Sequence, residues 1–129
     1  MSEKTYSTEK TTKTPFMNFD SSTGTFEVKG KSVPENSIIF YKPLFIWLDN
    51  YALNPAPKTV LNVQFDYFNT SSSKCIVDLF KRMEQISKSG KGEAIINWQY
   101  YNQDDDMLEA GEDYQSIIKV PFNLVSFTK

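Results

Sequence analysis

The sequence contains no histidine, and Cys75 is its one cysteine among 129 residues. A lone cysteine excludes an internal disulfide and is compatible with a reducing compartment. Without histidine or a second cysteine, no nucleophile with a neighbouring base can be read along the chain. The composition therefore disfavours an enzyme, and it gives no pattern for a cofactor.

Long apolar runs and an excess of positive charge are also missing. No apolar run reaches the ~20 residues that a membrane-spanning helix needs, and residues 1–14 lack the apolar segment of a secretory signal. The net charge is −2 and the pI is about 5.1, whereas nucleic-acid-binding domains usually carry a basic patch. These absences predict a soluble cytoplasmic protein that binds neither membranes nor nucleic acids.

Aromatic residues, by contrast, are abundant at 15% of the chain, with ten Phe and seven Tyr. A chain of this length suits one domain and buries roughly two thirds of its unfolded surface. Residues 1–14, "MSEKTYSTEKTTKT", are mostly Ser, Thr, Lys and Glu, which bury too little surface to offset the entropy of ordering. We therefore predict a flexible N-terminal tail over residues 1–14 and one folded domain over residues 15–129.

Alternation of apolar and polar residues predicts five strands. The clearest covers residues 60–68, where leucine, valine, phenylalanine and tyrosine alternate with asparagine, glutamine and aspartate. Residues 20–24 have the composition of a hairpin turn between the first two strands. Pro121 lacks a ladder donor, so the last strand is expected at a sheet edge or to begin at the proline. The predicted strands cover residues 16–20, 25–30, 60–68, 93–101 and 119–127.

Apolar residues at helical spacing predict three helices. The first has an apolar face from Leu44 to Tyr51 and is expected to start at Pro43, after a turn over residues 36–41. The other two are predicted over residues 75–90, with Gly90 at the end, and over residues 104–118.

The predicted order of elements is β-β-α-β-α-β-α-β. The strand over residues 60–68, the helix over 75–89 and the strand over 93–101 form a plausible βαβ crossover. We expect a single α/β domain, with a mixed sheet of about five strands packed against about three helices.

Four consecutive hydroxyl residues lie between the strand over residues 60–68 and the following helix. The first turn of a helix has unpaired N–H groups and about half a positive charge, so this position favours an anion such as phosphate. The candidate site residues are Asn69, Thr70, Ser71, Ser72, Ser73 and Lys74.

Capping alone is the simplest interpretation of this cluster. One of Asn69, Thr70 or Ser71 caps the helix and contributes ~1 kcal/mol. Capping explains one hydroxyl of the four, however, and it leaves Lys74 at the unfavourable end of the helix dipole. A negative charge would relieve that mismatch, either on a bound phosphorylated ligand or on a phosphorylated hydroxyl. The spacing leaves both alternatives open.

The acidic run over residues 104–113 invites comparison with a divalent metal site. Its glycine and terminal glutamate are misplaced for an EF-hand. Asp106 and Glu109 are instead typical of a helix start with a capping-box-like arrangement. We interpret the run as a solvated acidic surface and predict no metal, and we assign Cys75 a structural role.

The sequence resembles the SiaC family of bacterial regulatory phosphoproteins. The resemblance rests on "TPFMNFD", "GTFEVKGKSVPENSIIFYKPLFIWLDNY", "FDYFNTSSSK" and "INWQYYNQDDDMLEAGEDY". It implies a fold similar in style to the STAS-type anti-sigma antagonists. It further implies that Thr70, the threonine of "NTSSSK", is phosphorylated by a SiaB-type kinase and dephosphorylated by a SiaA-type phosphatase with a PP2C-like domain. The unphosphorylated form is then expected to bind an effector, which is a diguanylate cyclase in one branch of the family.

These expectations combine into a switch hypothesis. Phosphate on Thr70 would be held by first-turn N–H groups and by Ser72 or Ser73, with Lys74 adding a charge-assisted contact. The added charge would block a partner's docking surface without refolding the domain. The alternative is a small-molecule or phosphate-ligand binding protein that uses the turn over residues 69–74.

Overall fold

A computed structural model describes residues 4–128 of the chain. It is an α/β domain whose six strands form one mixed sheet, with three helices in the connections. The elements are β1 (Thr5–Thr8), β2 (Phe16–Asp20), β3 (Thr25–Ser32), α1 (Ser37–Tyr51), β4 (Lys58–Phe68), α2 (Thr70–Lys88), β5 (Glu93–Tyr101), α3 (Asp105–Ile117) and β6 (Phe122–Phe127).

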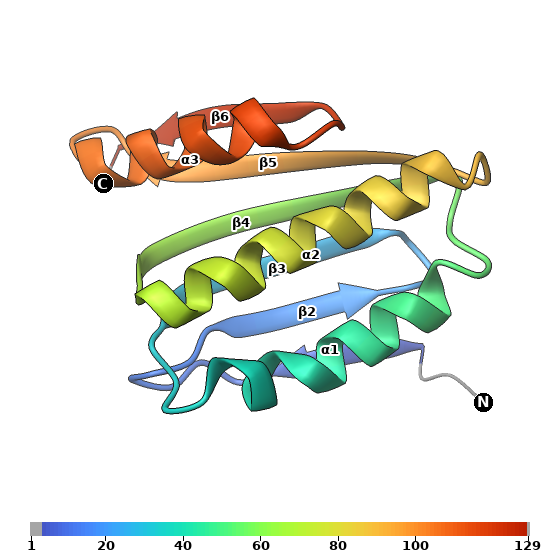
Figure 1. The fold of residues 1–129 in the computed structure, drawn as a ribbon, viewed down its shortest axis with the longest axis horizontal. Helices are drawn as coiled ribbons and strands as arrows, with labels where there is room; N and C mark the ends of the chain where they lie inside the picture. Colours follow the sequence, from blue (N-terminus) through green and yellow to red (C-terminus); the bar gives the residue numbers. More distant parts are fainter. Residues whose placement is uncertain (1–3, 129) are drawn as a thin grey trace.

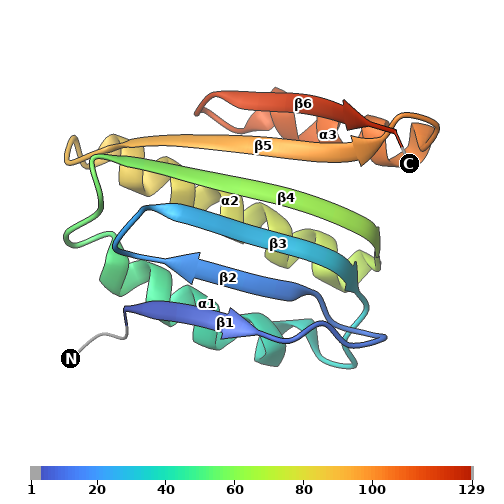
Figure 2. The same cartoon turned by 180° about the vertical axis from the view of Figure 1, so that it is seen from behind.

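The strands lie side by side in the order in which they occur in the sequence. β1, β2 and β3 pair antiparallel, and β3, β4, β5 and β6 pair parallel. Each parallel connection passes through a helix, and all three helices cover the same face of the sheet (Figures 1 and 2). The predicted crossover from β4 through α2 to β5 is confirmed.

The core lies between the sheet and the helices. Leu61, Val63 and Phe65 alternate inward from β4, as their spacing predicts, and all are buried. Trp98 of β5 is almost fully buried, and its indole N–H donates to the Met107 carbonyl at 2.9 Å. The hydroxyl cluster lies directly after the carboxyl end of β4.

The expected tail contains a strand. The described part of residues 1–14 includes β1, which pairs with β2 and adds a sixth strand to the predicted five. The Lys4 carbonyl accepts from the Ser21 N–H at 2.9 Å, and the Thr8 hydroxyl donates to the Pro15 carbonyl at 2.9 Å. Pairing with an existing strand supplies hydrogen bonds that composition does not reveal. Residues 1–3 of the expected tail lie outside the described residues.

The first helix begins earlier than predicted. α1 starts at Ser37, with Asn36 as its cap, so the turn expected over residues 36–41 is helical and Pro43 lies inside the helix. Proline removes one helical hydrogen bond to the carbonyl four residues earlier. Both Pro43 and Ile39 are exposed, so water can solvate that carbonyl.

The other boundaries also follow local capping. α2 begins at Thr70, five residues before its predicted start, and Gly90 follows its end with φ of 73°, as expected for a helix terminus. α3 lies within its predicted span of residues 104–118. Its cap is Asp104, whose carboxylate accepts from the Met107 N–H, so the capping arrangement expected at Asp106 is wrong. β6 begins directly after Pro121 at a sheet edge, which confirms the prediction from that proline.

Candidate functional site

The candidate site is the turn between β4 and α2. The Asn69 side-chain oxygen accepts from the Ser72 N–H at 2.9 Å, and the Asn69 carbonyl accepts from the Ser73 N–H at 3.1 Å. The Asn69 N–H donates to the Ser32 carbonyl at 3.1 Å, at the end of the neighbouring strand β3. Asn69 is therefore the cap, one of the three residues that the sequence suggested, and Thr70 is the first helical residue.

Ser72 is buried in a network of hydroxyl groups. Its hydroxyl donates to the Ser32 carbonyl at 2.9 Å and accepts from the Ser32 hydroxyl at 2.9 Å. The Ser32 hydroxyl also bonds the Tyr41 hydroxyl of α1 at 2.7 Å. With 0% of its surface exposed, Ser72 does not reach the solvent side of the turn. The structure thus contradicts its expected role in holding a phosphate.

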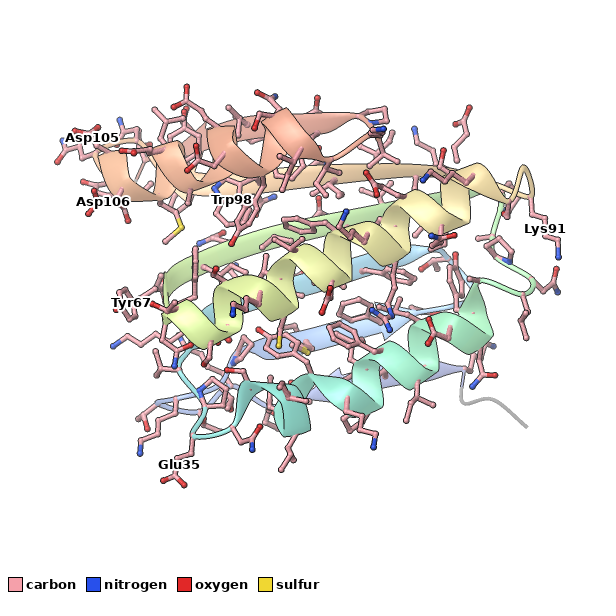
Figure 3. The ribbon with its side chains drawn as sticks, in the orientation of Figure 1. Glu35, Tyr67, Lys91, Trp98, Asp105 and Asp106 are labelled. Atoms are coloured by element: carbon pink, nitrogen blue, oxygen red, sulfur yellow. The ribbon has the colours of Figure 1, made fainter. Side chains whose placement is uncertain are left out.

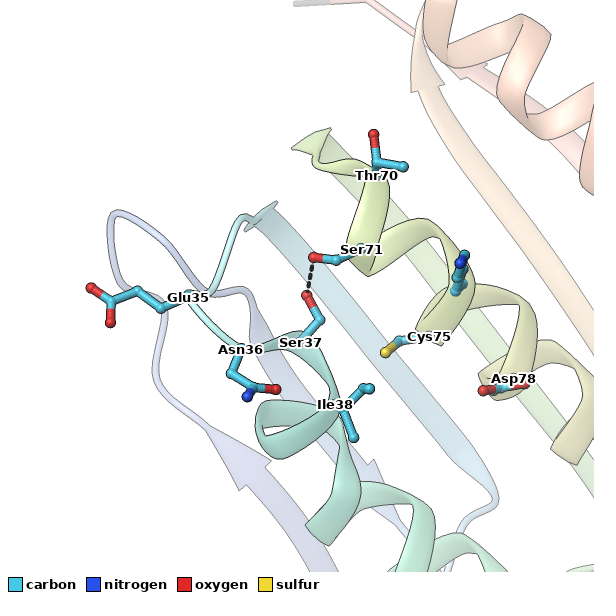
Figure 4. A pocket seen from close by; sticks show the side chains of 9 residues that line it. Glu35, Asn36, Ser37, Ile38, Thr70, Ser71, Cys75 and Asp78 are labelled. Carbon is cyan, nitrogen blue, oxygen red and sulfur yellow. Dashed lines mark hydrogen bonds between the residues drawn. The ribbon is translucent and has the colours of Figure 1, made fainter.

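Ser71 joins the starts of two helices. Its hydroxyl lies 2.7 Å from the Ser37 hydroxyl in the first turn of α1 (Figure 4). Asn36 caps α1 as Asn69 caps α2, so the two positive helix ends lie close together on one side of the sheet. The sequence did not predict this neighbour, because residues 36–41 were interpreted as a turn.

Thr70 has a different environment from the three serines. It is exposed, and Figure 4 shows its side chain directed away from the Ser71–Ser37 contact. Its hydroxyl and the N–H groups of Thr70 and Ser71 have no hydrogen-bond partner among residues 4–128. The first turn of α2 contains no acidic residue. Electrostatically, this position favours an added anion.

The remaining predicted residues divide between the two sides of the turn. Lys74 is exposed and lines the same hollow as Thr70 and Ser71. Ser73 is half-buried and faces α3, where its carbonyl accepts a long 3.5 Å hydrogen bond from the Tyr114 hydroxyl. The structure therefore brings Thr70, Ser71 and Lys74 together and places Ser73 apart from them.

A groove between α1 and α2 begins at this turn. A hollow of about 620 Å³ at the Thr70 end continues into one of about 440 Å³ along the helices, and Ile38, Cys75 and Asp78 line both. Ile38 and Ile46 on the α1 side are 75% and 54% exposed. The guanidinium of Arg82 lies 4.1 Å from the Phe45 ring centroid and pairs with Asp49 at 3.1 Å. An apolar groove next to an exposed hydroxyl suits protein docking.

Cys75 forms part of the groove wall without being a reactive thiol. Its burial, and secondarily the charge of Asp78, raise its pKa above the usual value. The thiol therefore stays protonated at neutral pH, although it lies near a helix N-terminus.

No group of three or more Cys, Asp or Glu side chains suited to a metal occurs within residues 4–128. The acidic residues Asp105 and Asp106 point outward from the start of α3 (Figure 3). Over the same residues, no helix is long and apolar enough to cross a membrane.

Comparison with known proteins identifies the class. A family described as regulatory phosphoproteins matches residues 8–127, so the protein is a regulatory phosphoprotein and not an enzyme. The chain belongs to the SiaC family. An uncharacterised protein of Pseudomonas aeruginosa strain UCBPP-PA14 is 25% identical over 112 residues, which are 87% of this chain and 88% of that protein.

Solved structures show the same fold. A chain in the crystal structure of the diguanylate cyclase SiaD with its activator SiaC, from P. aeruginosa, has a TM-score of 0.87 and 23% identity, over 95% of this chain and 99% of that chain. SiaC of P. aeruginosa has a TM-score of 0.86 and 23% identity, over 95% and 98% of the two chains. The predicted α/β domain is confirmed, with one more strand than expected.

Proposed function

We propose that this protein is a phosphorylation-controlled binding switch whose modified residue is Thr70. A SiaB-type kinase adds the phosphate, a PP2C-type phosphatase removes it, and the bare form binds an effector. One observation carries the proposal. Thr70 is the residue of the four-hydroxyl run that is both exposed and without a hydrogen-bond partner for its hydroxyl among residues 4–128.

The electrostatics of the turn support this choice. A phosphate on Thr70 carries about −1.5 to −2 charges at pH 7. The unpaired N–H groups of Thr70 and Ser71 and the positive end of α2 would stabilise it by up to ~2 kcal/mol. Lys74, on the same side, would offset part of the added charge. Phosphorylation therefore requires no refolding of the domain.

The groove beside Thr70 gives the phosphate a means of controlling docking. A partner that covers Ile38 and Ile46 must come close to Thr70, which lines the end of the same groove. Burying a dianion without matched cations costs several kcal/mol. At that end, the groove is lined by one cation, Lys74, and by two carboxylates, Glu35 and Asp78. The side chains of the groove therefore do not neutralise the charge of the phosphate. We infer that phosphorylation releases the partner.

The structure from P. aeruginosa in which SiaC activates a diguanylate cyclase indicates one effector class to test first. We propose that a diguanylate cyclase is the effector here too, which would place this protein in cyclic di-GMP signalling. A cytoplasmic location follows from the proposal, because a protein kinase draws its ATP from the cytoplasm.

Phosphopeptide mapping tests the proposed site. The full chain is incubated with its cognate kinase and ATP, alongside Thr70→Ala and the neighbouring control Ser73→Ala. We expect the phosphate on Thr70 in the wild type and in Ser73→Ala, and no incorporation in Thr70→Ala with an unchanged circular dichroism spectrum. A phosphate found on Ser7, Thr8 or Ser71, with Thr70 bare, would refute the assignment.

A second candidate is a binding protein for a small phosphorylated ligand. The hollow of about 620 Å³ lies in the size range of small-molecule sites and is flanked by two helix N-termini. Calorimetric titration with nucleotides and inorganic phosphate distinguishes the candidates. Saturable binding that Thr70→Ala leaves intact, without kinase-dependent labelling, would favour the binding protein.

A further inference from the structure

β6 has an unpaired outer edge. It is the last strand of the sheet on the side of α3 (Figure 2). The Pro121 carbonyl accepts from the Ile96 N–H and the Phe127 carbonyl from the Asn102 N–H, both at 2.9 Å. Because alternate residues direct their backbone groups to the same side, the backbone groups of the even-numbered residues point away from β5. Those of Leu124 and Ser126 have no partner among residues 4–128.

This edge has little of the protection that exposed edges usually have. Its sequence, FNLVSF, contains no charge and no proline, and the backbone of β6 makes a regular parallel ladder with β5. Among the described residues, one outward-pointing backbone group of β6 has a hydrogen-bond partner. It is the Phe122 carbonyl, which accepts from the Gln115 side-chain amide at 2.7 Å. Natural proteins block long uncharged edges because they recruit other strands. An edge left open in this way is suited to accept a strand.

The charge of α3 selects the occupant. The Gln115 contact places one side of α3 over the β6 edge, and Glu112 shares that side at helical spacing. Pairing with a second copy would bring two acidic helices together and cost electrostatic energy. A strand with basic side chains would be attracted instead. The helix and its cap contain no lysine or arginine, and their acidic residues are Asp104, Asp105, Asp106, Glu109, Glu112 and Asp113.

We propose that the β6 edge binds an extended, basic segment of a partner protein, which adds to the sheet as a seventh strand. Backbone hydrogen bonds to Leu124 and Ser126 supply affinity, and the carboxylates of α3 select lysine or arginine. α1 lies over the side of the sheet that carries β1 and β2, away from β6 (Figure 1). The residues that line the groove at Thr70 include none from α3 or β6. This second surface is therefore separate from the proposed switch and does not depend on it.

Amide hydrogen exchange by NMR tests the proposal on the full chain. The probe is a ten-residue peptide alternating valine and lysine, and the control peptide alternates valine and glutamate. We expect the lysine peptide to slow exchange at Leu124 and Ser126 and to bind more weakly at high salt. Exchange that slows elsewhere, or equal binding of the glutamate peptide, would overturn the proposal. So would protection of Leu124 and Ser126 that rises with protein concentration without peptide, because the occupant would then be a second copy.

Proline substitution at the two sheet edges provides matched variants. Ser126→Pro removes an outward N–H, which an edge strand tolerates, and should weaken binding of the lysine peptide at least tenfold. Ser7→Pro is the control on β1, where the Lys4–Ser21 bond makes the Ser7 N–H point outward, and should leave binding unchanged. Equal effects of the two substitutions would contradict the assignment. If Ser126→Pro fails to fold, the exchange pattern of the wild type decides.

Discussion

Ser72 and Ser73 are neighbours in the sequence, but their hydroxyls lie in different environments. Ser72 is fully buried and bonded to Ser32, whereas Ser73 is half-buried at the α3 side. Ser72→Ala leaves the Ser32 groups short of a buried partner and should lower the free energy of unfolding by about 1–3 kcal/mol. Ser73→Ala should change it by no more than about 0.5 kcal/mol. Urea denaturation measures both, and equal losses would argue against the buried network.

Cys75 allows a second test at the residue scale. Burial raises the pKa of its thiol, and the thiolate is the reactive form. In the folded protein at pH 8, iodoacetamide should therefore modify Cys75 much more slowly than it modifies the urea-unfolded chain. Mass spectrometry follows the alkylation. Comparable rates in the folded and unfolded states would show that the groove wall at Cys75 is open.

Residue types in the turn were predictable from the sequence, but their burial was not. Asn69 as a possible cap and Thr70 at a helix start follow from local rules. The burial of Ser72 depends on Ser32, which is 40 positions away in the sequence. A pattern confined to residues 65–74 carries no information about that contact. Local rules alone do not separate the four hydroxyls, and only the family resemblance pointed to Thr70. In the structure, Thr70 is the residue of the four that is exposed and has no hydrogen-bond partner for its hydroxyl among residues 4–128.

At the scale of elements, α3 depends on a glycine that packs against an indole. A Cβ on Gly111 would lie 2.5 Å from the Trp98 ring, closer than atoms tolerate. Gly111→Ala should destabilise the protein by about 1–3 kcal/mol through overpacking, although alanine is intrinsically the better helix former by about 1 kcal/mol. Thermal unfolding measures the change. The control Ser116→Ala, at an exposed position of the same helix, should be neutral or stabilising.

Elements with strong periodicity were predicted well, and those that depend on a neighbour were not. β5 and the hairpin of β2 and β3 match their predicted spans closely because their alternation is local. The four hydroxyl-bearing residues of β1 form a strand only by pairing with β2, so their composition alone predicts a tail. The rule that proline belongs in a first turn predicts that α1 starts at Pro43. The helix begins earlier because Asn36 caps it and because Pro43 is exposed. The groove at Thr70 was missed for the same reason.

At the scale of the whole molecule, buried tyrosines couple stability to alkaline pH. Burial raises the pKa of Tyr114 to about 12, and burial also raises the pKa of Tyr41. An unfolded tyrosine ionises near pH 10. Between pH 10 and 12 the unfolded state therefore binds fewer protons than the folded state, and the free energy of unfolding falls as pH rises.

Urea titrations at pH 9, 10 and 11 measure this dependence. Tyr114→Phe removes one of the groups whose pKa is raised by burial and should make the loss of stability above pH 10 less steep than in the wild type. An unchanged slope would mean that Tyr114 is accessible to solvent in the folded protein.

The account as a whole depends on phosphate at Thr70 controlling docking at the neighbouring groove. Isothermal titration calorimetry with a diguanylate cyclase as the candidate effector tests this most directly, using the bare protein and the protein phosphorylated on Thr70. We predict that the bare form binds and that phosphorylation weakens binding at least tenfold, whereas Thr70→Ala treated with kinase binds like the bare form. Equal affinities of the bare and phosphorylated forms would contradict the account.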